Sequence, residues 1–255
     1  MNVIQPSPFR IINSPLSMSH SPPPQREVSD ELELLNELIP LNAQRIIELG
    51  CGAAKLGRSL VTRFPRCDWV GLEVDKIQHA ANLSAPAPRM QFVESGAQAI
   101  PFDDASFDLA IMLKSLHHVP LALLDTALHE TWRVLRPDGL LYVSEPVFAG
   151  ALNEINRLFN DEEFVRAQAQ DALDRALASG SWTTHAELRF SMPVHFKDVD
   201  DYMRRMLDVT FADRSFGEAM RQQIRERFAP HMTPTGASFA RPMHVRVLRK
   251  ASPGV

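Results

Sequence analysis

Short apolar runs alternate with amphipathic segments along the first two thirds of the chain. The apolar runs cover residues 45–49, 69–73, 90–93, 107–113 and 140–143. Between them, apolar residues recur every three or four positions, as in Leu121, Leu124, Leu128, Trp132 and Leu135. This spacing is typical of an amphipathic helix. Strands that are apolar on both faces and separated by helices predict a doubly wound, mostly parallel sheet of the Rossmann-like α/β class.

Signals for helix ends support this order. A Ser29-Asp30 pair precedes a helix that Pro40 stops, and further helices are expected to end near Phe64, Leu83 and Leu135. The last of these ends at the turn sequence Arg136-Pro137-Asp138-Gly139, just before the fifth strand.

Beyond Pro146 the pattern changes. A helical stretch over 151–178 closes at Ser179-Gly180, and an alternating run follows over 187–196. We interpret residues 147–200, approximately, as a helical and strand insertion after strand five. A helix at 197–207, a strand near 209–212, a helix up to 228 and a final antiparallel strand at 244–248 complete a seven-stranded sheet.

The first 28 residues are rich in Pro and Ser, including Pro22-Pro23-Pro24, and lack a sustained apolar period. They predict a flexible arm, with folding over a ligand as a lid as the alternative. We therefore expect one domain over 29–255, with its core at 44–146.

Composition excludes several classes of function. The net charge of −4 gives no bulk attraction to phosphate backbones, so nucleic acid is disfavoured as a partner. The two cysteines, Cys51 and Cys67, lack metal-ligand or paired spacing, so neither a metal site nor a disulfide is predicted. No basic segment leads into an apolar one at the N-terminus, and no apolar run is long enough for a membrane span, which favours a cytoplasmic protein.

The most informative segment runs from Ile46 to Gly57, where an apolar strand leads into glycines and then a helix. Glycine allows a tight turn and close approach of a ligand to the backbone. The dinucleotide fingerprint requires a third glycine where this chain has Lys55. Glu48 would repel a diphosphate but suits a ligand with a cationic ammonium group, such as S-adenosylmethionine.

Four motifs resemble those of class I S-adenosylmethionine-dependent methyltransferases. Glu48-Leu49-Gly50-Cys51-Gly52 is similar to motif I, and Val70-Gly71-Leu72-Glu73 resembles the acidic end of the second strand. Residues 100–112 are similar to the segment before the fourth strand, and 133–141 to the element before the fifth. The resemblance covers about 45–146, and ubiquinone/menaquinone-biosynthesis-like enzymes are the branch it points to.

The resemblance implies methyl transfer from S-adenosylmethionine to a small-molecule acceptor by in-line displacement, with S-adenosylhomocysteine as product. Glu73 would bind both ribose hydroxyls, which suits a carboxylate because it can accept two hydrogen bonds; Asp75 is the second choice. The implied cofactor-binding residues are Glu48, Gly50, Cys51, Gly52, Glu73, Val74, Gly96, Ala97, Leu113 and Lys114.

The chain departs from this branch at one position. Gly96 stands where an Asp usually accepts a hydrogen bond from the adenine amino group, with Gln98 and Glu94 as nearby substitutes. This departure leaves open a non-catalytic, cofactor-binding protein. A tRNA or rRNA methyltransferase is the other alternative.

Candidate bases follow the fourth and fifth strands. His117, His118 and Glu145 are expected at the carboxyl edge of the sheet, where ligands of this fold class bind. Either histidine could accept a proton from an acceptor hydroxyl, or one could cap the next helix; Glu145 could instead bind a loop backbone. The sequence carries no motif that identifies the acceptor or the oligomeric state.

Overall fold

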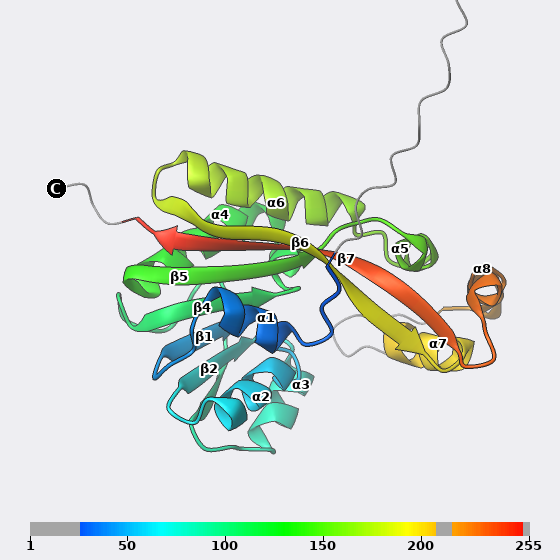
Figure 1. The fold of residues 1–255 in the computed structure, drawn as a ribbon, viewed down its shortest axis with the longest axis horizontal. Helices are drawn as coiled ribbons and strands as arrows, with labels where there is room; N and C mark the ends of the chain where they lie inside the picture. Colours follow the sequence, from blue (N-terminus) through cyan, green and yellow to red (C-terminus); the bar gives the residue numbers. More distant parts are fainter. Residues whose placement is uncertain (1–25, 208–215, 252–255) are drawn as a thin grey trace, which may run out of the picture.

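The computed structural model describes residues 26–207 and 216–251 (Figure 1). Its strands are β1 (Arg45–Leu49), β2 (Asp68–Glu73), β3 (Met90–Glu94), β4 (Phe107–Leu113), β5 (Leu135–Pro146), β6 (Trp182–Phe196) and β7 (Ala237–Lys250). Its α-helices are α1 (Glu31–Leu38), α2 (Lys55–Arg63), α3 (Lys76–Leu83), α4 (Leu124–Val134), α5 (Ala151–Asn156), α6 (Glu163–Ala178), α7 (Val199–Leu207) and α8 (Glu218–Phe228). Short 3₁₀ turns are η1 (Leu116–His118), η2 (Leu121–Leu123) and η3 (Ala229–His231).

The seven strands form one sheet in the order β3-β2-β1-β4-β5-β7-β6. Strand β7 is antiparallel to both of its neighbours, and the other six strands run in the same direction. The carboxyl ends of β1, β2, β4 and β5 therefore meet at one edge, the right-hand side of the sheet in Figure 1. The predicted fold class, including the final antiparallel strand, is confirmed.

Helices cover both faces of the sheet. On one face, α1 and α2 pack over β1, β2 and β4 through a core that contains Leu35, Leu60 and Trp69. On the other face, α4 and α6 pack through Leu128, Leu173 and their neighbours. Strand β4 is apolar on both sides because it lies between these two cores. This explains why its sequence reads as a continuous apolar run.

A third core lies beyond the carboxyl edge. Strand β7 pairs with β5 over residues 243–249. The preceding residues, 237–242, pair with β6 alone. The two strands leave the sheet as a ribbon that carries α7 and α8 (Figure 1). Phe196, Tyr202 and Phe228 are fully buried there, against α5 and its neighbours. We call this unit the ribbon lobe.

The structure refines the predicted elements after β5. The single helix expected over 151–178 is two helices, α5 and α6, with a break at which Asp161 accepts a hydrogen bond from the backbone N–H of Glu163 at 3.1 Å. Strand β6 lies inside the stretch interpreted as an insertion, yet it is the edge strand of the main sheet. The strand expected near 209–212 and most of the N-terminal arm lie outside the described residues. Residues 26–28 pair with Ser191 of β6.

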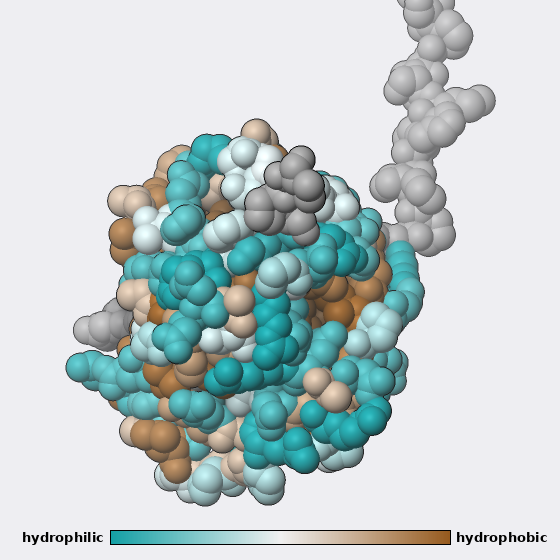
Figure 2. Space-filling view, turned by 90° about the vertical axis from the view of Figure 1, so that its left-hand side faces the viewer, coloured by the Kyte–Doolittle hydropathy of each residue, from teal (hydrophilic) through white to brown (hydrophobic). Residues whose placement is uncertain are grey.

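The two ends of the sheet differ in the residues at their surface. Figure 2 views the end at which the parallel strands begin; hydrophilic residues predominate there, with apolar residues in separate groups. The functional candidates lie at the other end. Within the described ranges, no helix combines the length and apolarity that a membrane crossing requires.

Candidate active site at the carboxyl edge

The glycine turn after β1 is held against the end of β2. The backbone N–H groups of Gly50 and Cys51 both donate to the carbonyl of Leu72 at 2.9 Å. Gly50 and Gly52 have φ angles of 76° and 51°, in the left-handed region that glycine adopts without strain. A Cβ on Gly50 would lie 2.8 Å from that of Ser115, so glycine is required there sterically as well.

Glu73 closes this turn. One carboxylate oxygen accepts a hydrogen bond from the Gly52 N–H at 2.7 Å, and the other accepts from the Asp75 N–H at 2.8 Å. The Asn82 side chain donates to the Gly52 carbonyl at 2.7 Å. The turn and the acid that the sequence predicts as one cofactor site are therefore adjacent. Each carboxylate oxygen keeps a lone pair for a further donor.

Glu48 lies beneath the turn and is only 3% exposed. It accepts a hydrogen bond from Trp69 Nε1 at 3.0 Å. Burial, which outweighs this bond and the positive charge of Lys114, raises the pKa of Glu48 from 4.5 to about 8. Glu48 is therefore mostly protonated at neutral pH.

Lys114 follows β4 with a φ of 57°. Its ammonium group lies 3.2 Å from a carboxylate oxygen of Glu31, at the start of α1. The Tyr142 hydroxyl donates to the other oxygen of Glu31 at 3.4 Å. The N-terminal helix is thereby tied to the carboxyl edge beside the cofactor turn.

The remaining predicted cofactor residues differ in their surroundings. Val74 is 64% exposed next to Glu73, which leaves an apolar surface available to a ligand. Leu113 is half-buried at the end of β4. Gly96 lies against the side-chain amide of Gln98, while Ala97 is buried in the core. Within residues 26–207 and 216–251, no hydrogen bond joins Gly96 or Ala97 to the glycine turn.

His117 and Glu145 form a buried pair. Nδ1 of His117 is hydrogen-bonded to Oε2 of Glu145, whose Oε1 accepts from the Leu116 N–H at 2.9 Å. Glu145 is 1% exposed. Its expected bond to a loop backbone is present, and it contacts a ligand site only through His117.

A cavity of about 280 Å³ opens beside this pair. His117, His118 and Lys114 line it from the sheet edge, and Arg205 lines it from the ribbon lobe. Loss of hydration and the neighbouring His117 ring lower the pKa of His118, so its imidazole is neutral at pH 7. Both predicted histidines thus line a cavity at the same sheet edge as the glycine turn.

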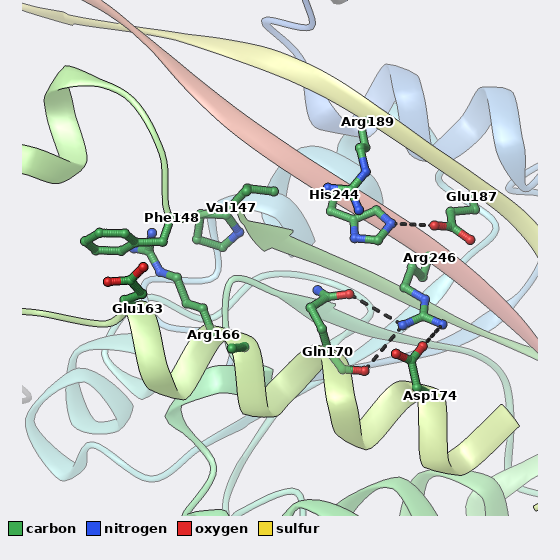
Figure 3. A pocket seen from close by; sticks show the side chains of 12 residues that line it. Val147, Phe148, Glu163, Arg166, Gln170, Asp174, Glu187, Arg189, His244 and Arg246 are labelled. Atoms are coloured by element: carbon green, nitrogen blue, oxygen red, sulfur yellow. Dashed lines mark hydrogen bonds and ion pairs between the residues drawn. The ribbon is translucent and has the colours of Figure 1, made fainter. Parts of the chain in front are cut away.

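A larger hollow of about 460 Å³ lies between α6 and the strands β6 and β7 (Figure 3). Two pairs of its lining residues contact each other: His244 with Glu187 at 2.8 Å, and Arg246 with Asp174 at 2.7 Å. Figure 3 shows Arg246 reaching toward α6, where it meets Asp174 and Gln170.

The structure also assembles a group that the sequence did not predict. One donor atom each from His117, His118 and Glu162 lie within 4.8 Å of one another, a spacing that could admit a metal ion. Glu162 follows His118 by more than forty positions, so no local spacing could reveal the group.

Other site residues could not be predicted from the sequence either, because no local spacing reveals them. Trp69, Asn82 and Arg241 contact the site through tertiary structure, with no motif around them. Arg205, on the amphipathic helix α7, also lines the cavity, and the sequence around it carries no motif. The apolar residues Phe190 and Phe196 of the alternating run are fully buried and belong to the core.

Comparisons with known proteins agree with this arrangement. Residues 46–139 match the methyltransferase domain family. An uncharacterized methyltransferase of Mycobacterium tuberculosis is 35% identical over 113 residues, which are 43% of this chain and 42% of that protein. A fatty-acid O-methyltransferase of Mycolicibacterium smegmatis is 30% identical over 104 residues, 39% of this chain and 36% of that protein. The chain thus spans less than half the length of these curated relatives.

The structural comparison extends further along the chain. The YcgJ protein of Bacillus subtilis superposes with a TM-score of 0.63 at 17% identity, covering 87% of this chain and 98% of its own. The chain therefore shares the fold of that protein, a Rossmann-like sheet, and here β7 is inserted between β5 and β6. The sequence match to a methyltransferase domain over residues 46–139 and the shared Rossmann-like fold thus agree with each other.

Proposed function

We propose that the protein transfers a methyl group from S-adenosylmethionine to a small-molecule acceptor. The observation that carries the proposal is the adjacency of two features. The glycine turn closed by Glu73 lies at the same sheet edge as the cavity reached by Lys114 and His117. A cofactor bound at the turn would present its methyl group toward this cavity.

The residues at the turn fit this cofactor. A Cβ built on Gly52 meets no atom within 4 Å, so the backbone there faces open space that a ligand can enter. Glu73 offers carboxylate oxygens to a cis-diol, and exposed Val74 offers an apolar contact beside it. Glu48 would stabilise the ammonium group in its ionised form.

The cofactor supplies an electrophilic methyl group when bound, so the chain's own residues need to align the acceptor and accept a proton. Glu145 binds Nδ1 of His117, and Nε2 lies 3.9 Å from a carboxylate oxygen of Glu162, which lines the same cavity. This is the arrangement of a general base held in one tautomer by a carboxylate. His117 is therefore our candidate base, and Glu145 its positioning residue.

A small acceptor suits the dimensions and charge of the site. The cavity volume of about 280 Å³ is near the lower end for small-molecule pockets. The net charge of −4 supplies no bulk attraction to nucleic acid. The relative from M. smegmatis, by its name, methylates fatty acids, which also favours a small acceptor.

Isothermal calorimetry with S-adenosylmethionine and S-adenosylhomocysteine tests the cofactor assignment. We expect Gly50→Val to abolish binding because its Cβ would clash with Ser115. Gly217→Val is the matched control, since Gly217 has a φ of −66° and open space around it. Absence of binding to the unmodified protein refutes the proposal.

Transfer itself is tested with a radiolabelled methyl donor and pools of small metabolites. Label in an organic-soluble or anionic small-molecule fraction supports the proposal. Tight S-adenosylhomocysteine binding without transfer to any pool indicates a non-catalytic binding protein. Label found only in added tRNA or rRNA assigns the acceptor to nucleic acid instead.

A further inference from the structure

The cavity beside His117 is strongly cationic. Four positive side chains line it: Lys114 from the loop after β4, and Arg166, Arg205 and Arg241 from α6, α7 and β7. Among the described residues that line it, Glu162 is the single carboxylate. A convergence of cations from distant parts of the chain is costly unless a negative charge compensates it.

Three of these cations already have partners. Lys114 pairs with Glu31 at 3.2 Å, Arg166 with Glu162 at 2.5 Å, and Arg205 with Asp201 at 3.4 Å. Arg205 also donates to the carbonyl of His195 at 2.7 Å.

Arg241 differs from them. Across residues 26–207 and 216–251, its guanidinium forms no hydrogen bond or ion pair. Burial, together with the guanidinium groups of Arg166 and Arg205, lowers the pKa of Arg241. Nε of Arg166 is likewise buried without a hydrogen-bond partner. The cavity therefore holds unused donors in a positive field.

A metal ion would not compensate the positive charge of the cavity. Although burial opposes ionisation of Glu162, nearby positive charge, including that of Arg166, lowers its pKa, so its carboxylate is charged. That charge is already paired with Arg166. A cation between His117, His118 and Glu162 would then face the cationic side chains around it, whereas an anion would be attracted by them.

We propose that the acceptor carries an oxyanion, a carboxylate or a phosphate, that Arg241 binds in this cavity. The anion is a recognition group, additional to the group that receives the methyl. Arg241 presents a planar fork of N–H donors that matches a carboxylate or phosphate in bidentate geometry. This inference rests on the proposed function, because it names the class of acceptor for the same site.

The test uses the full chain saturated with S-adenosylhomocysteine, with occupancy confirmed by calorimetry. Matched probes are 4-hydroxybenzoate and 4-hydroxybenzamide, 3-hydroxybutyrate and its amide, and inorganic phosphate. Ligand-observed NMR gives each dissociation constant. We expect at least one acid to bind about tenfold or more tightly than its amide, which is the effect of one charge-assisted contact. Relative binding of the acids and of phosphate distinguishes the two kinds of oxyanion.

Two variants assign the effect. Arg241→Gln should abolish the preference for the acid while leaving S-adenosylhomocysteine affinity unchanged. Arg204→Gln is the control. It also removes one positive charge, but the Arg204 side chain lies on α7, is 70% exposed and does not line the cavity. Arg204→Gln should keep the preference for the acid over its amide. If the preference came only from the overall positive charge, both variants would reduce it equally.

The inference is overturned if the acids bind no more tightly than their amides and phosphate does not bind, or if binding of the preferred oxyanion is unchanged in Arg241→Gln. Each of these results can occur with normal S-adenosylhomocysteine binding, which leaves the proposed function intact. Loss of S-adenosylhomocysteine binding in the unmodified protein instead removes the proposed function, and the acceptor assignment with it.

Discussion

The buried carboxyl of Glu48 should make the stability of the protein depend on pH in a defined direction. Its pKa in the folded protein is about 8, against 4.5 for an ordinary Glu. Below pH 4.5 the group is protonated in both states. Between 4.5 and 8 the unfolded chain releases the proton and the folded protein retains it, so unfolding becomes more favourable as pH rises.

The expected change in the free energy of unfolding follows from the pH range between these two pKa values. The slope approaches about 1.4 kcal/mol per pH unit, so Glu48 should lower the free energy of unfolding by roughly 2 to 3 kcal/mol between pH 5.5 and 7.5. Glu48→Gln has no carboxyl to titrate and can still accept the hydrogen bond from Trp69. Its unfolding free energy should therefore fall less over the same range, by the contribution of this one group.

Urea denaturation at several pH values, followed by far-UV circular dichroism, measures the difference. Glu226→Gln, at an exposed position on α8, controls for the loss of a carboxyl and should follow the unmodified protein. Parallel stability curves for Glu48→Gln and the unmodified protein would refute the assignment of a raised pKa to Glu48.

The same variant tests the role of Glu48 toward the cofactor. At pH 7 only about one molecule in ten carries an ionised Glu48 before binding. If the ammonium group of S-adenosylmethionine requires that charge, its affinity for the unmodified protein should rise severalfold or more from pH 6 to 7.5. In Glu48→Gln this rise should be absent in calorimetric titrations.

Further predictions concern packing, positioning and the loop before β4. Gly71→Ala should destabilise the protein by about 1–3 kcal/mol in urea denaturation, because the added Cβ would lie 2.1 Å from the Trp69 ring; Gly217→Ala, in open space, should not. Glu145→Gln should reduce kcat about 10–100-fold with little change in KM, since His117 loses its orienting carboxylate; an equal effect on S-adenosylhomocysteine binding would indicate a structural role. Arg133→Ala should cost roughly 2–3 kcal/mol, as its guanidinium donates to the carbonyls of Ile100 and Phe102 at 2.9 and 2.8 Å. Arg136→Ala, at an exposed ion pair, should cost less than about 1 kcal/mol.

The sequence predicts the central sheet well because each strand there is signalled locally. The apolar runs at Arg45–Leu49 and Phe107–Leu113 coincide with β1 and β4. Both strands are buried on both faces, so nearly every residue must be apolar. The glycine turn is equally local, and its adjacency to Glu73 follows from the parallel pairing of β1 with β2.

The cavity could not be predicted in the same way. Arg166, Arg205 and Arg241 lie on α6, α7 and β7, and their convergence depends on how the ribbon lobe packs. On an amphipathic helix such as α7, arginine is usually on the solvated side, so the sequence around Arg205 does not indicate a ligand. Position 162 shows the same limit, since Glu162 meets His117 only through the break between α5 and α6.

The pairing of β6 with β7 has a consequence for the range of molecules that such a protein can accommodate. Within the fourteen-residue strand β7, pairing with β5 begins at Met243, and Arg241 lies just before that point. The part of β7 that contains Arg241 pairs with β6 alone, so the strand pair is anchored in the sheet at one end and free of it at the other. Adding two residues to each strand would carry α7 and α8 outward by roughly 7 Å without disturbing any residue that holds the cofactor turn. Changes in ribbon length would thus alter acceptor size separately from methyl-donor binding.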